Sequence, residues 1–507
     1  MRSRREVLGV LGAGGAVVAG LAGCSSSGRD RRPSGTLTLG TAVDVNSFAP
    51  AEAQDAHFMQ YYQAPYDGLL RIAPDGTYTP GLATEWSYDR SRTVLHLTLR
   101  PGVRFHDGTP FDGRAVAANL MAAKKGTGTG AAGFASLRSV RVDSPGGVDL
   151  VLERPDPGIV RQLAMGCGMM ASPKAVGTPG LRTRPVGTGP YVLDPKGTTP
   201  TVKYTFVRNA DYWDKRSFPF EKVVLIPMTD AIARLNAVRS GQVDGAFGDA
   251  LNIRAATSAG LKATVSPGPG FQGLFLFDRD GRVSRPLGDV RVRRAVNHAM
   301  DRDGIAKILV DGRARTTGQV FNPQSPAADL SLDTYYPHDP ARARTLLAQA
   351  GYARGFDLDI PEPVYPNLSP ILGQLLGDVG IRVNWVQVPT QSVNAQYLSG
   401  KFPAVYYQLQ SSDPWQAVNF LGTAKAAWNP LHVDDPAVQA AIDAVRDAPE
   451  GAARDAAYHR LDRVYVERAW FAPAYFPDAV YFSSPAIEVT PQSLQIVPSL
   501  QNFRPAA

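Results

Sequence analysis

The stretch Pro80–Val116 constrains the fold most, because a strand, two turns and a helix start follow one another within it. Leu95, Leu97 and Leu99 occupy alternate positions, which is the period of a strand with one buried face. The pairs that follow, at 101–102 and 107–108, are Pro-Gly and Asp-Gly, and they suit tight turns. Asp112 then caps a helix. This order indicates an α/β or α+β domain, and the stretch contains no catalytic constellation.

Length and charge limit the class of protein. A chain of 507 residues is too long for one ordinary core, so we expect two or more lobes. Hydrophobic residues make up 44% and charged residues 20%, as in a globular protein. The net charge of +7 is mild, and no dense basic run occurs after the first 32 residues. Nucleic acid is therefore not an expected partner.

The N-terminus has the order of an export signal: arginines, then a weakly apolar run, then small residues. Ser3–Leu8 resembles a twin-arginine signal, with Val7 where Phe is commoner. Residues 21–24, Leu-Ala-Gly-Cys, resemble a bacterial lipobox, which implies cleavage before Cys24 and lipid on its sulfur. We therefore predict a signal peptide over residues 1–23 and a flexible tether over 24–35, which is rich in Ser, Gly, Pro and Arg.

Several segments resemble one family in order along the chain. The segment 99–111, LRPGVRFHDGTPF, is followed by PVGTGPY at 185–191, NADYW at 209–213 and SGQVD at 240–244. Two longer segments, at 289–302 and 339–352, continue the match. These segments closely resemble the solute-binding proteins of peptide and nickel ABC importers, bacterial extracellular solute-binding family 5.

The resemblance implies an α/β fold of two lobes, the periplasmic-binding-protein or Venus flytrap type, with mixed sheets and two hinge crossings. It places lobe 1 at residues 36–272, with a small β-rich subdomain at about 51–185. Lobe 2 would occupy 273–467, and residues 468–507 would return to lobe 1.

Helix starts in the second half of the chain are marked by aspartates. Asp289, Asp339 and Asp435 each precede apolar residues at helical spacing, and the last two are followed by Pro at the first helical position. Earlier in the chain, Thr229 is predicted to start a helix that buries Ile232 and Leu235 on one face and ends at Ser240-Gly241.

The segment Ala404–Trp415 carries most of the expected ligand recognition. Peptide binders of the family have a Trp and then an Asp that neutralises the peptide amine, and alignment on Asp413-Pro414 puts Tyr407 and Gln410 at those positions. The amide of Gln410 cannot replace that charge. We therefore expect a neutral, blocked or differently charged solute, unless Asp413 takes the role. A shifted register, with Gln410 in a solvated turn, is the alternative.

The remaining site residues are predicted from their places near the expected cleft. Asn46 lies in a loop where the family often has Leu-Asp-Pro, and Tyr475 would provide a flat wall with a polar tip. Strand alternation allows only one of Tyr406 and Tyr407 to face the cleft. The full ligand-binding set is Asn46, Gln272, Tyr407, Gln408, Gln410, Asp413, Trp415 and Tyr475.

Catalytic motifs do not emerge from the sequence. No two of the seven histidines lie three to five residues apart, and G-x-S-x-G, H-E-x-x-H and P-loop patterns are missing. Gly128–Gly133 matches G-x-G-x-x-G but follows a helix and precedes a strand, so a loop is favoured. We predict no cofactor and no enzyme. Because the family includes nickel and haem carriers, a metal complex held by one His stays open. Cys167 is predicted to be a buried thiol.

These observations lead to one expected function. The chain would be a lipid-anchored, extracytoplasmic, monomeric receptor that captures a peptide or related small solute by hinge closure and delivers it to an ABC permease. Its partners would be the solute, the permease and, through lipid on Cys24, the membrane. The alternatives are a sensory or assembly lipoprotein with the same fold and an exported hydrolase.

Overall fold

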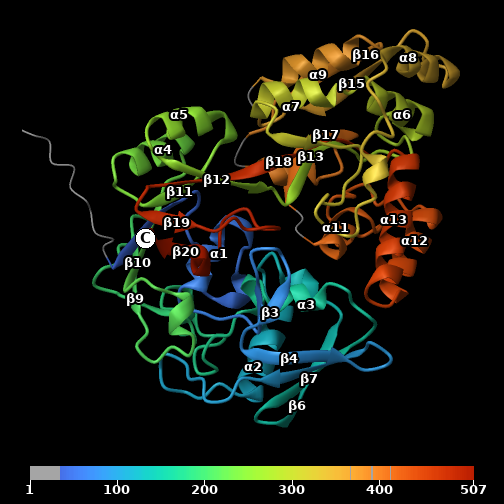
Figure 1. Ribbon diagram of the computed structural model, residues 1–507. Coiled ribbons are helices and arrows are strands. Elements are labelled where there is room, and N and C mark those ends of the chain that lie inside the picture. Colours follow the sequence, from blue (N-terminus) through green and yellow to red (C-terminus); the bar gives the residue numbers. More distant parts are fainter. Residues whose placement is uncertain (1–34, 366, 390–391, 411–412) are drawn as a thin grey trace, which may run out of the picture. The chain divides into compact units, whose positions relative to one another are not determined.

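β18, a strand of thirteen residues from Phe471 to Ser483, links the two ends of the main sheet in the computed structural model of the chain. Its first half pairs with β13 (Gly270–Leu276), and its second half pairs with β12 (Lys262–Pro267) and β11 (Gly245–Gly248). Figure 1 shows β18 running beside β13 and toward β11. The structure describes residues 35–507 except 366, 390–391 and 411–412.

The main sheet is mixed, with the order β17-β13-β18-β11-β1-β10-β9-β8, and β12 and β14 also pair with β18. β1 runs parallel to its neighbours β10 and β11, and the other pairs in this sheet are antiparallel. The remaining strands of the sheet are β1 (Thr36–Thr41), β8 (Tyr191–Leu193), β9 (Tyr204–Arg208), β10 (Lys222–Pro227), β14 (Ala314–Thr316) and β17 (Ala404–Gln410).

Smaller sheets occupy other parts of the chain. A four-stranded antiparallel sheet has the order β4-β5-β7-β6, and three two-stranded sheets pair β2 with β3, β15 with β16 and β19 with β20. These strands are β2 (Leu70–Ile72), β3 (Tyr78–Pro80), β4 (Ala83–Tyr88), β5 (Val94–Leu99), β6 (Leu137–Ser144), β7 (Gly147–Leu152), β15 (Phe356–Pro361), β16 (Ile381–Val386), β19 (Ile487–Val489) and β20 (Phe503–Pro505).

Most longer helices begin at an aspartate whose carboxylate accepts a backbone N–H of the first turn. The helices are α1 (Met59–Gln63), α2 (Gly113–Lys124), α3 (Ile159–Gln162), α4 (Ala231–Arg239), α5 (Ile253–Ser258), α6 (Val290–Ala299), α7 (Arg302–Val310), α8 (Pro340–Gln349), α9 (Leu368–Gly377), α10 (Val393–Tyr397), α11 (Pro414–Leu421), α12 (Pro436–Asp447) and α13 (Ala452–Glu467).

The predicted strand and capping patterns agree with these elements. β5 buries Leu95, Leu97 and Leu99 and exposes His96 and Thr98. The helices predicted after Asp289, Asp339 and Asp435 are α6, α8 and α12.

One prediction is wrong: Ile232 on α4 is 52% exposed. The helix instead buries Arg234 together with Leu235, because the Arg234 guanidinium donates hydrogen bonds to backbone carbonyls.

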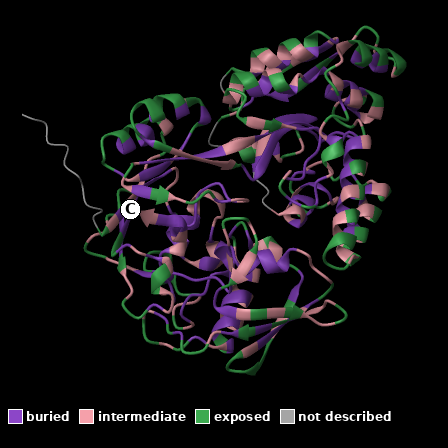
Figure 2. Cartoon of the chain, in the orientation of Figure 1, coloured by how far each residue is buried: buried purple, intermediate pink, exposed green. Residues whose placement is uncertain are grey.

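Buried apolar residues form separate clusters along the chain. The largest uses residues from Leu37 to Leu225, with Tyr481 and three later residues. Two others use residues from Phe271 to Phe476 and share β13, β17 and the first half of β18. A smaller cluster combines residues 235–261 with Val480 and Phe482 of β18. The two halves of β18 therefore belong to different cores, and Figure 2 shows most of this strand and of β13 as buried.

Candidate functional site

A cavity of about 440 Å³ lies where β13 and β18 pair, and we call it the β13–β18 cavity. One wall comes from the chain before β13: His57, α4 and the segment Phe247–Leu251. The other wall comes from the chain after β13: Ile308–Val310 of α7, Tyr365 and Asn367. Gln272, Gln408 and Tyr475 lie in the strands that separate these walls. Three of the predicted site residues, far apart in the sequence, therefore meet in one cavity.

Gln272 is the centre of a hydrogen-bond network in this cavity and is only 5% exposed. Its Oε1 accepts hydrogen bonds from the hydroxyls of Tyr475 and of Tyr406, the latter at 3.4 Å. Its Nε2 donates to Gln408 Oε1 at 3.3 Å. Burial raises the pKa of the Tyr475 and Tyr406 phenols, so both hydroxyls remain protonated donors. The protein itself thus satisfies Gln272, and Gln408 Nε2 has no partner among the described residues.

The strands place these side chains on one face. Gln272 lies opposite Gln408 in the β13–β17 pair and opposite Tyr475 in the β13–β18 pair. The register of β13 against β18 shifts between Gln272 and Gly273, which is a β-bulge, a feature that redirects side chains at a sheet. A Cβ at Gly273 would lie 2.6 Å from the Ala472 carbonyl oxygen, so the close approach of β18 here requires glycine.

Arg234 is the buried cation of the cavity wall, and it is 5% exposed. Its Nε donates to the Phe247 carbonyl at 2.8 Å, and its Nη1 donates to the carbonyls of Met228 and Thr229 at 2.7 and 2.9 Å. No carboxylate of the described residues lies within ion-pair distance of it. Burial lowers the pKa of Arg234, and the attraction of Asp230 and Asp249 offsets this effect only in part.

Other titratable groups line the same cavity. The ring of His57 packs edge-on against Phe247 with centroids 4.7 Å apart, and its Nδ1 is buried without a partner among the described residues. Burial, with the nearby Arg234 charge, lowers the pKa of His57 to about 4, so the ring is neutral near pH 7. Asp249 is exposed, and burial raises the pKa of Asp478. The cavity therefore holds one deep cation and two carboxylates.

Tyr406 and Tyr407 point to opposite faces of β17, as alternation requires. Tyr406 is fully buried and bonds to Gln272, whereas Tyr407 stacks on Trp428 with centroids 4.6 Å apart. Tyr407 does not line the β13–β18 cavity. Tyr407 was the tyrosine predicted to bind the ligand, whereas Tyr406 is the one that contacts the cavity residue Gln272, and neither lines the cavity itself.

Asp413 and Trp415 lie at the start of α11. Asp413 caps this helix, since its Oδ1 accepts the Gln416 backbone N–H at 3.0 Å. Burial raises the pKa of Asp413, and the nearby Arg161 opposes that rise. Trp415 is 8% exposed and packs against the backbone of Gly158, where an added Cβ would lie 2.8 Å from the indole Cδ1. This contact joins the segment before α3 to the start of α11.

The last predicted residues fall elsewhere. Asn46 is exposed in the loop after β1 and lines none of the cavities described here. Gln410 ends β17 opposite Gly270, but its side chain lies outside the described residues, as do Cys24, the predicted signal peptide and nearly all of the tether. Sequence reasoning missed His57, Arg234 and Tyr365, which have no motif of their own.

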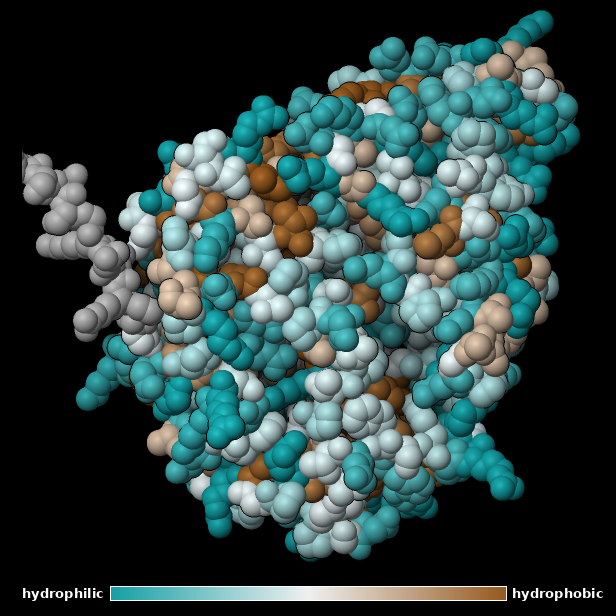
Figure 3. Space-filling model, in the orientation of Figure 1, coloured by the Kyte–Doolittle hydropathy of each residue, from teal (hydrophilic) through white to brown (hydrophobic). Residues whose placement is uncertain are grey.

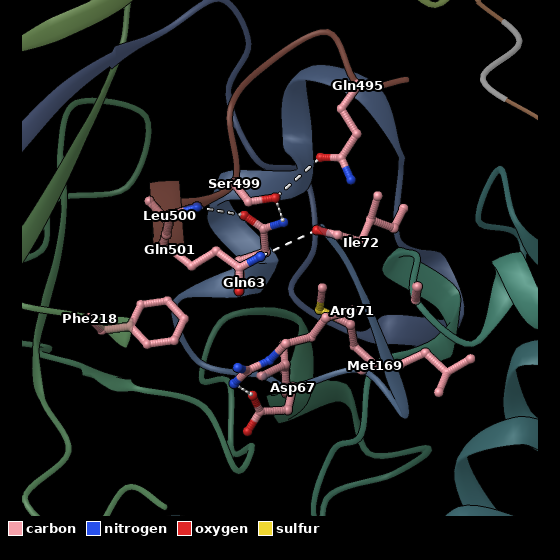
Figure 4. A pocket seen from close by; sticks show the side chains of 14 residues that line it. Gln63, Asp67, Arg71, Ile72, Met169, Phe218, Gln495, Ser499, Leu500 and Gln501 are labelled. Carbon is pink, nitrogen blue, oxygen red and sulfur yellow. Dashed lines mark hydrogen bonds and ion pairs between the residues drawn. The ribbon is translucent and has the colours of Figure 1, made fainter. Parts of the chain in front are cut away.

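A second, much smaller pocket of about 40 Å³ lies beside a buried ion pair, Arg71 with Asp67 (Figure 4). Asp67 accepts hydrogen bonds from Arg71, the Tyr212 hydroxyl at 2.7 Å, Trp213 Nε1 and the Thr188 hydroxyl. Arg71 also pairs with Asp214 at 2.6 Å, and its guanidinium lies 4.4 Å from the Trp213 ring centroid. We call this set the Asp67 network.

Within the described residues, no three His, Cys, Asp or Glu side chains gather as a metal site would require. The helices of that part of the chain include none with the length and apolarity of a membrane span. The face in Figure 3 is mainly hydrophilic, with small scattered apolar patches. Cys167 is buried, and burial raises the pKa of its thiol to about 12, as expected for a structural cysteine.

Comparison with known proteins adds a family and a fold. Residues 77–429 match the model of the bacterial extracellular solute-binding proteins, family 5. The glutathione-binding protein GsiB of Salmonella typhi is 28% identical over 325 residues, which cover 63% of this chain and 62% of that protein. GsiB of Escherichia coli O157:H7 is 26% identical over 346 residues, or 68% of this chain and 65% of that protein. The chain thus spans a little under two thirds of the length of these curated relatives.

Solved structures share the architecture across nearly the whole chain. The substrate-binding protein CtaP of Listeria monocytogenes superposes with a TM-score of 0.81 at 17% identity, covering 94% of this chain and all of that one. DppA of Helicobacter pylori, in complex with the peptide STSA, gives 0.78 at 20% identity, covering 93% and 98%. NikA of Brucella suis, in complex with Fe(III)-EDTA, gives 0.80 at 23%, covering 93% and 100%. The fold is therefore that of the periplasmic binding proteins.

Proposed function

Because the chain belongs to the family 5 bacterial extracellular solute-binding proteins, we propose that it captures a peptide or related small solute for an ABC importer. The single observation that carries this proposal is the β13–β18 cavity, whose walls come from both sides of the connecting strands. Polar groups converge there among aromatic rings, as in small-molecule sites generally. Related proteins that bind glutathione, the peptide STSA or Ni(L-His) indicate the range of solutes to test.

Capture proceeds by closure of two lobes about β13 and β18. Lobe 1 comprises residues 36–272, with its β-rich subdomain at about 51–185, and 468–507 return to it; lobe 2 comprises 273–467. The separate apolar clusters support this division, since the two ends of β18 are buried in different ones. A solute that contacts both walls shifts the equilibrium toward the closed form by its differential affinity. The contact of Trp415 with Gly158 belongs to that closed form.

Recognition of a free peptide amine is weakened in this chain, because Gln410 replaces the aspartate expected there. Asp413 is engaged as the cap of α11, so its carboxylate is already in use. Calorimetry with a tripeptide and its N-acetylated form tests this point. We expect similar affinities for the two forms, and a large loss on acetylation would contradict the idea.

The N-terminus exports and anchors the receptor. Residues 1–23 act as a twin-arginine signal peptide, and Cys24 carries the lipid that holds the monomeric protein outside the cytoplasm at the cell membrane. Replacing Cys24 by Ser should release the protein from the membrane fraction. Replacing Arg4 and Arg5 by Lys should block export by the twin-arginine route while leaving the folded protein in the cytoplasm.

Native mass spectrometry of the protein purified from its own host tests the proposal most directly. A co-purified small solute that is retained in native spectra and lost after unfolding is the expected result. Turnover of that solute would favour the hydrolase alternative. Unchanged uptake in a strain that lacks the receptor would favour a sensory or assembly lipoprotein.

A further inference from the structure

Among the buried charges of the described residues, Arg234 has N–H donors without a hydrogen-bond partner and forms no ion pair, although Asp230 and Asp249 attract its charge from a distance. Its guanidinium presents five N–H donors. Nε and Nη1 use three of them on the carbonyls of Phe247, Met228 and Thr229. Nη2 forms no hydrogen bond or ion pair within the described residues. Arg234 lines the β13–β18 cavity, and its Nη2 is not among the fully enclosed side-chain atoms that lack a partner.

The backbone carbonyls hold Arg234 in position but do not neutralise it. Buried charges in proteins are normally paired, because an unpaired charge loses its hydration without compensation. Asp249 lines the same cavity, but it is exposed, caps the turn at Leu251 and forms no ion pair with Arg234. Asp478, the other carboxylate of the cavity, lies on β18. The protein's own carboxylates, Asp230 and Asp249, therefore compensate the buried charge of Arg234 only in part.

A second unused donor lies in the same cavity. Gln408 Oε1 accepts a hydrogen bond from Gln272 Nε2. The two N–H donors of Gln408 Nε2 have no partner among the described residues. His57 contributes a neutral ring with an unpartnered Nδ1. The interior of the cavity thus offers a cation and amide N–H groups, which suit an acceptor-rich group of the solute.

We infer that the solute carries an anionic group, a carboxylate or a phosphate, which enters the β13–β18 cavity and accepts hydrogen bonds from Arg234 Nη2. Only one nitrogen of the guanidinium is available, so a single oxygen of the anion contacts it rather than a bidentate pair. Gln408 Nε2 serves a second oxygen or a neighbouring carbonyl. The two carboxylates, Asp249 and Asp478, suit a cationic or N–H donor group elsewhere on the same solute. This inference rests on the proposed function and specifies the chemistry of its ligand.

Matched pairs of probes test the charge requirement on the full chain. Isothermal calorimetry compares N-acetyl-Ala-Ala and Ala-Ala-Ala with their C-terminal amides, and glycerol 3-phosphate with glycerol. We expect the acid of at least one pair to bind about tenfold or more tightly than its neutral partner, as a hydrogen bond to a charged group implies. The peptide and phosphate arms tell a carboxylate from a phosphate. If acids and neutral partners bind equally, the protein still captures solutes but the inference is wrong; if no probe binds, the proposed capture of peptides fails as well.

Two substitutions at Arg234 test whether this residue causes the preference for acids over their neutral partners. Arg234→Gln removes the charge and should reduce the acid-to-neutral affinity ratio to about one, whereas Arg234→Lys keeps the charge and should keep most of the ratio. Both lose carbonyl contacts, so a folding defect alone would affect them alike. Arg239→Gln removes an exposed charge from the same helix and should leave the ratio unchanged. A ratio that survives in Arg234→Gln would overturn the assignment.

Discussion

Arg71 and Arg234 are both largely buried, yet the chain treats them in opposite ways. Arg71 pairs with Asp67 and Asp214 and lies against the Trp213 ring, so two carboxylates of the protein compensate its charge. Among the described residues Arg234 donates hydrogen bonds to backbone carbonyls alone, and it lines the β13–β18 cavity. The difference separates a charge that holds the fold together from one that is available to a ligand.

The largest expected effect is on the paired side of this comparison. Asp67→Asn removes the carboxylate that serves Arg71, Tyr212 and Trp213, and leaves a buried cation with one partner fewer. We expect it to lower the free energy of unfolding by about 3 kcal/mol or more, the usual cost of breaking a buried pair. Urea denaturation measures this loss.

Asp214→Asn is the matched control, because Asp214 is the more exposed partner of Arg71 and should cost less. Solute selectivity should not change in either variant. If the free energy of unfolding of Asp67→Asn lies within about 1 kcal/mol of that of the parent protein, the Asp67 network contributes little to stability. The pairing of Arg71 would then not stabilise the fold.

A middle-sized effect should come from the contact between Gly158 and Trp415. The added methyl of Gly158→Ala would lie 2.8 Å from the indole, so the ring must move and the closed form loses its packing. We expect solute affinity to fall by about tenfold, corresponding to about 1.4 kcal/mol, with thermal stability of the solute-free protein nearly unchanged. Isothermal calorimetry measures the solute affinity, and differential scanning calorimetry measures the thermal stability.

Gly180→Ala controls for the added methyl, since nothing lies within 4 Å of the new Cβ there. It should bind solute as the parent does. Equal affinities for Gly158→Ala and Gly180→Ala would show that the Trp415 contact plays no part in closure.

The smallest effect concerns His57, the neutral ring in the wall beside Arg234. Its pKa of about 4 lies below the ordinary 6.5, so the unfolded chain binds a proton more readily than the folded protein between these values. Stability from this group is present above pH 6.5 and is lost as the pH falls toward 4. His57→Gln should therefore flatten the fall in melting temperature between pH 6.5 and 4.

The exposed His338→Gln serves as the control and should keep the slope of the parent protein. If both variants show the parental dependence of melting temperature on pH, protonation of His57 on unfolding does not cause the loss of stability. The ring would then be more accessible to water than its burial indicates.

Sequence patterns predicted the helices and strands of the fold better than the residues of the cavity. Capping aspartates and apolar spacing predicted α6, α8 and α12, because these signals are local. Arg234 was missed because an arginine in a short helix normally indicates a solvated face, and only the carbonyls around it explain its burial. The pairing of Gln272 with Tyr475, 203 residues later, depends on β13 and β18 meeting at a bulge, which no local pattern encodes.

Closure of the two lobes about β13 and β18 can be measured by small-angle X-ray scattering with and without a bound solute. The protein is first stripped of any co-purified solute by unfolding and refolding, and binding is verified by calorimetry in the same buffer. We expect a smaller radius of gyration in the solute-bound protein than in the stripped one. An unchanged radius of gyration at saturating solute would contradict it.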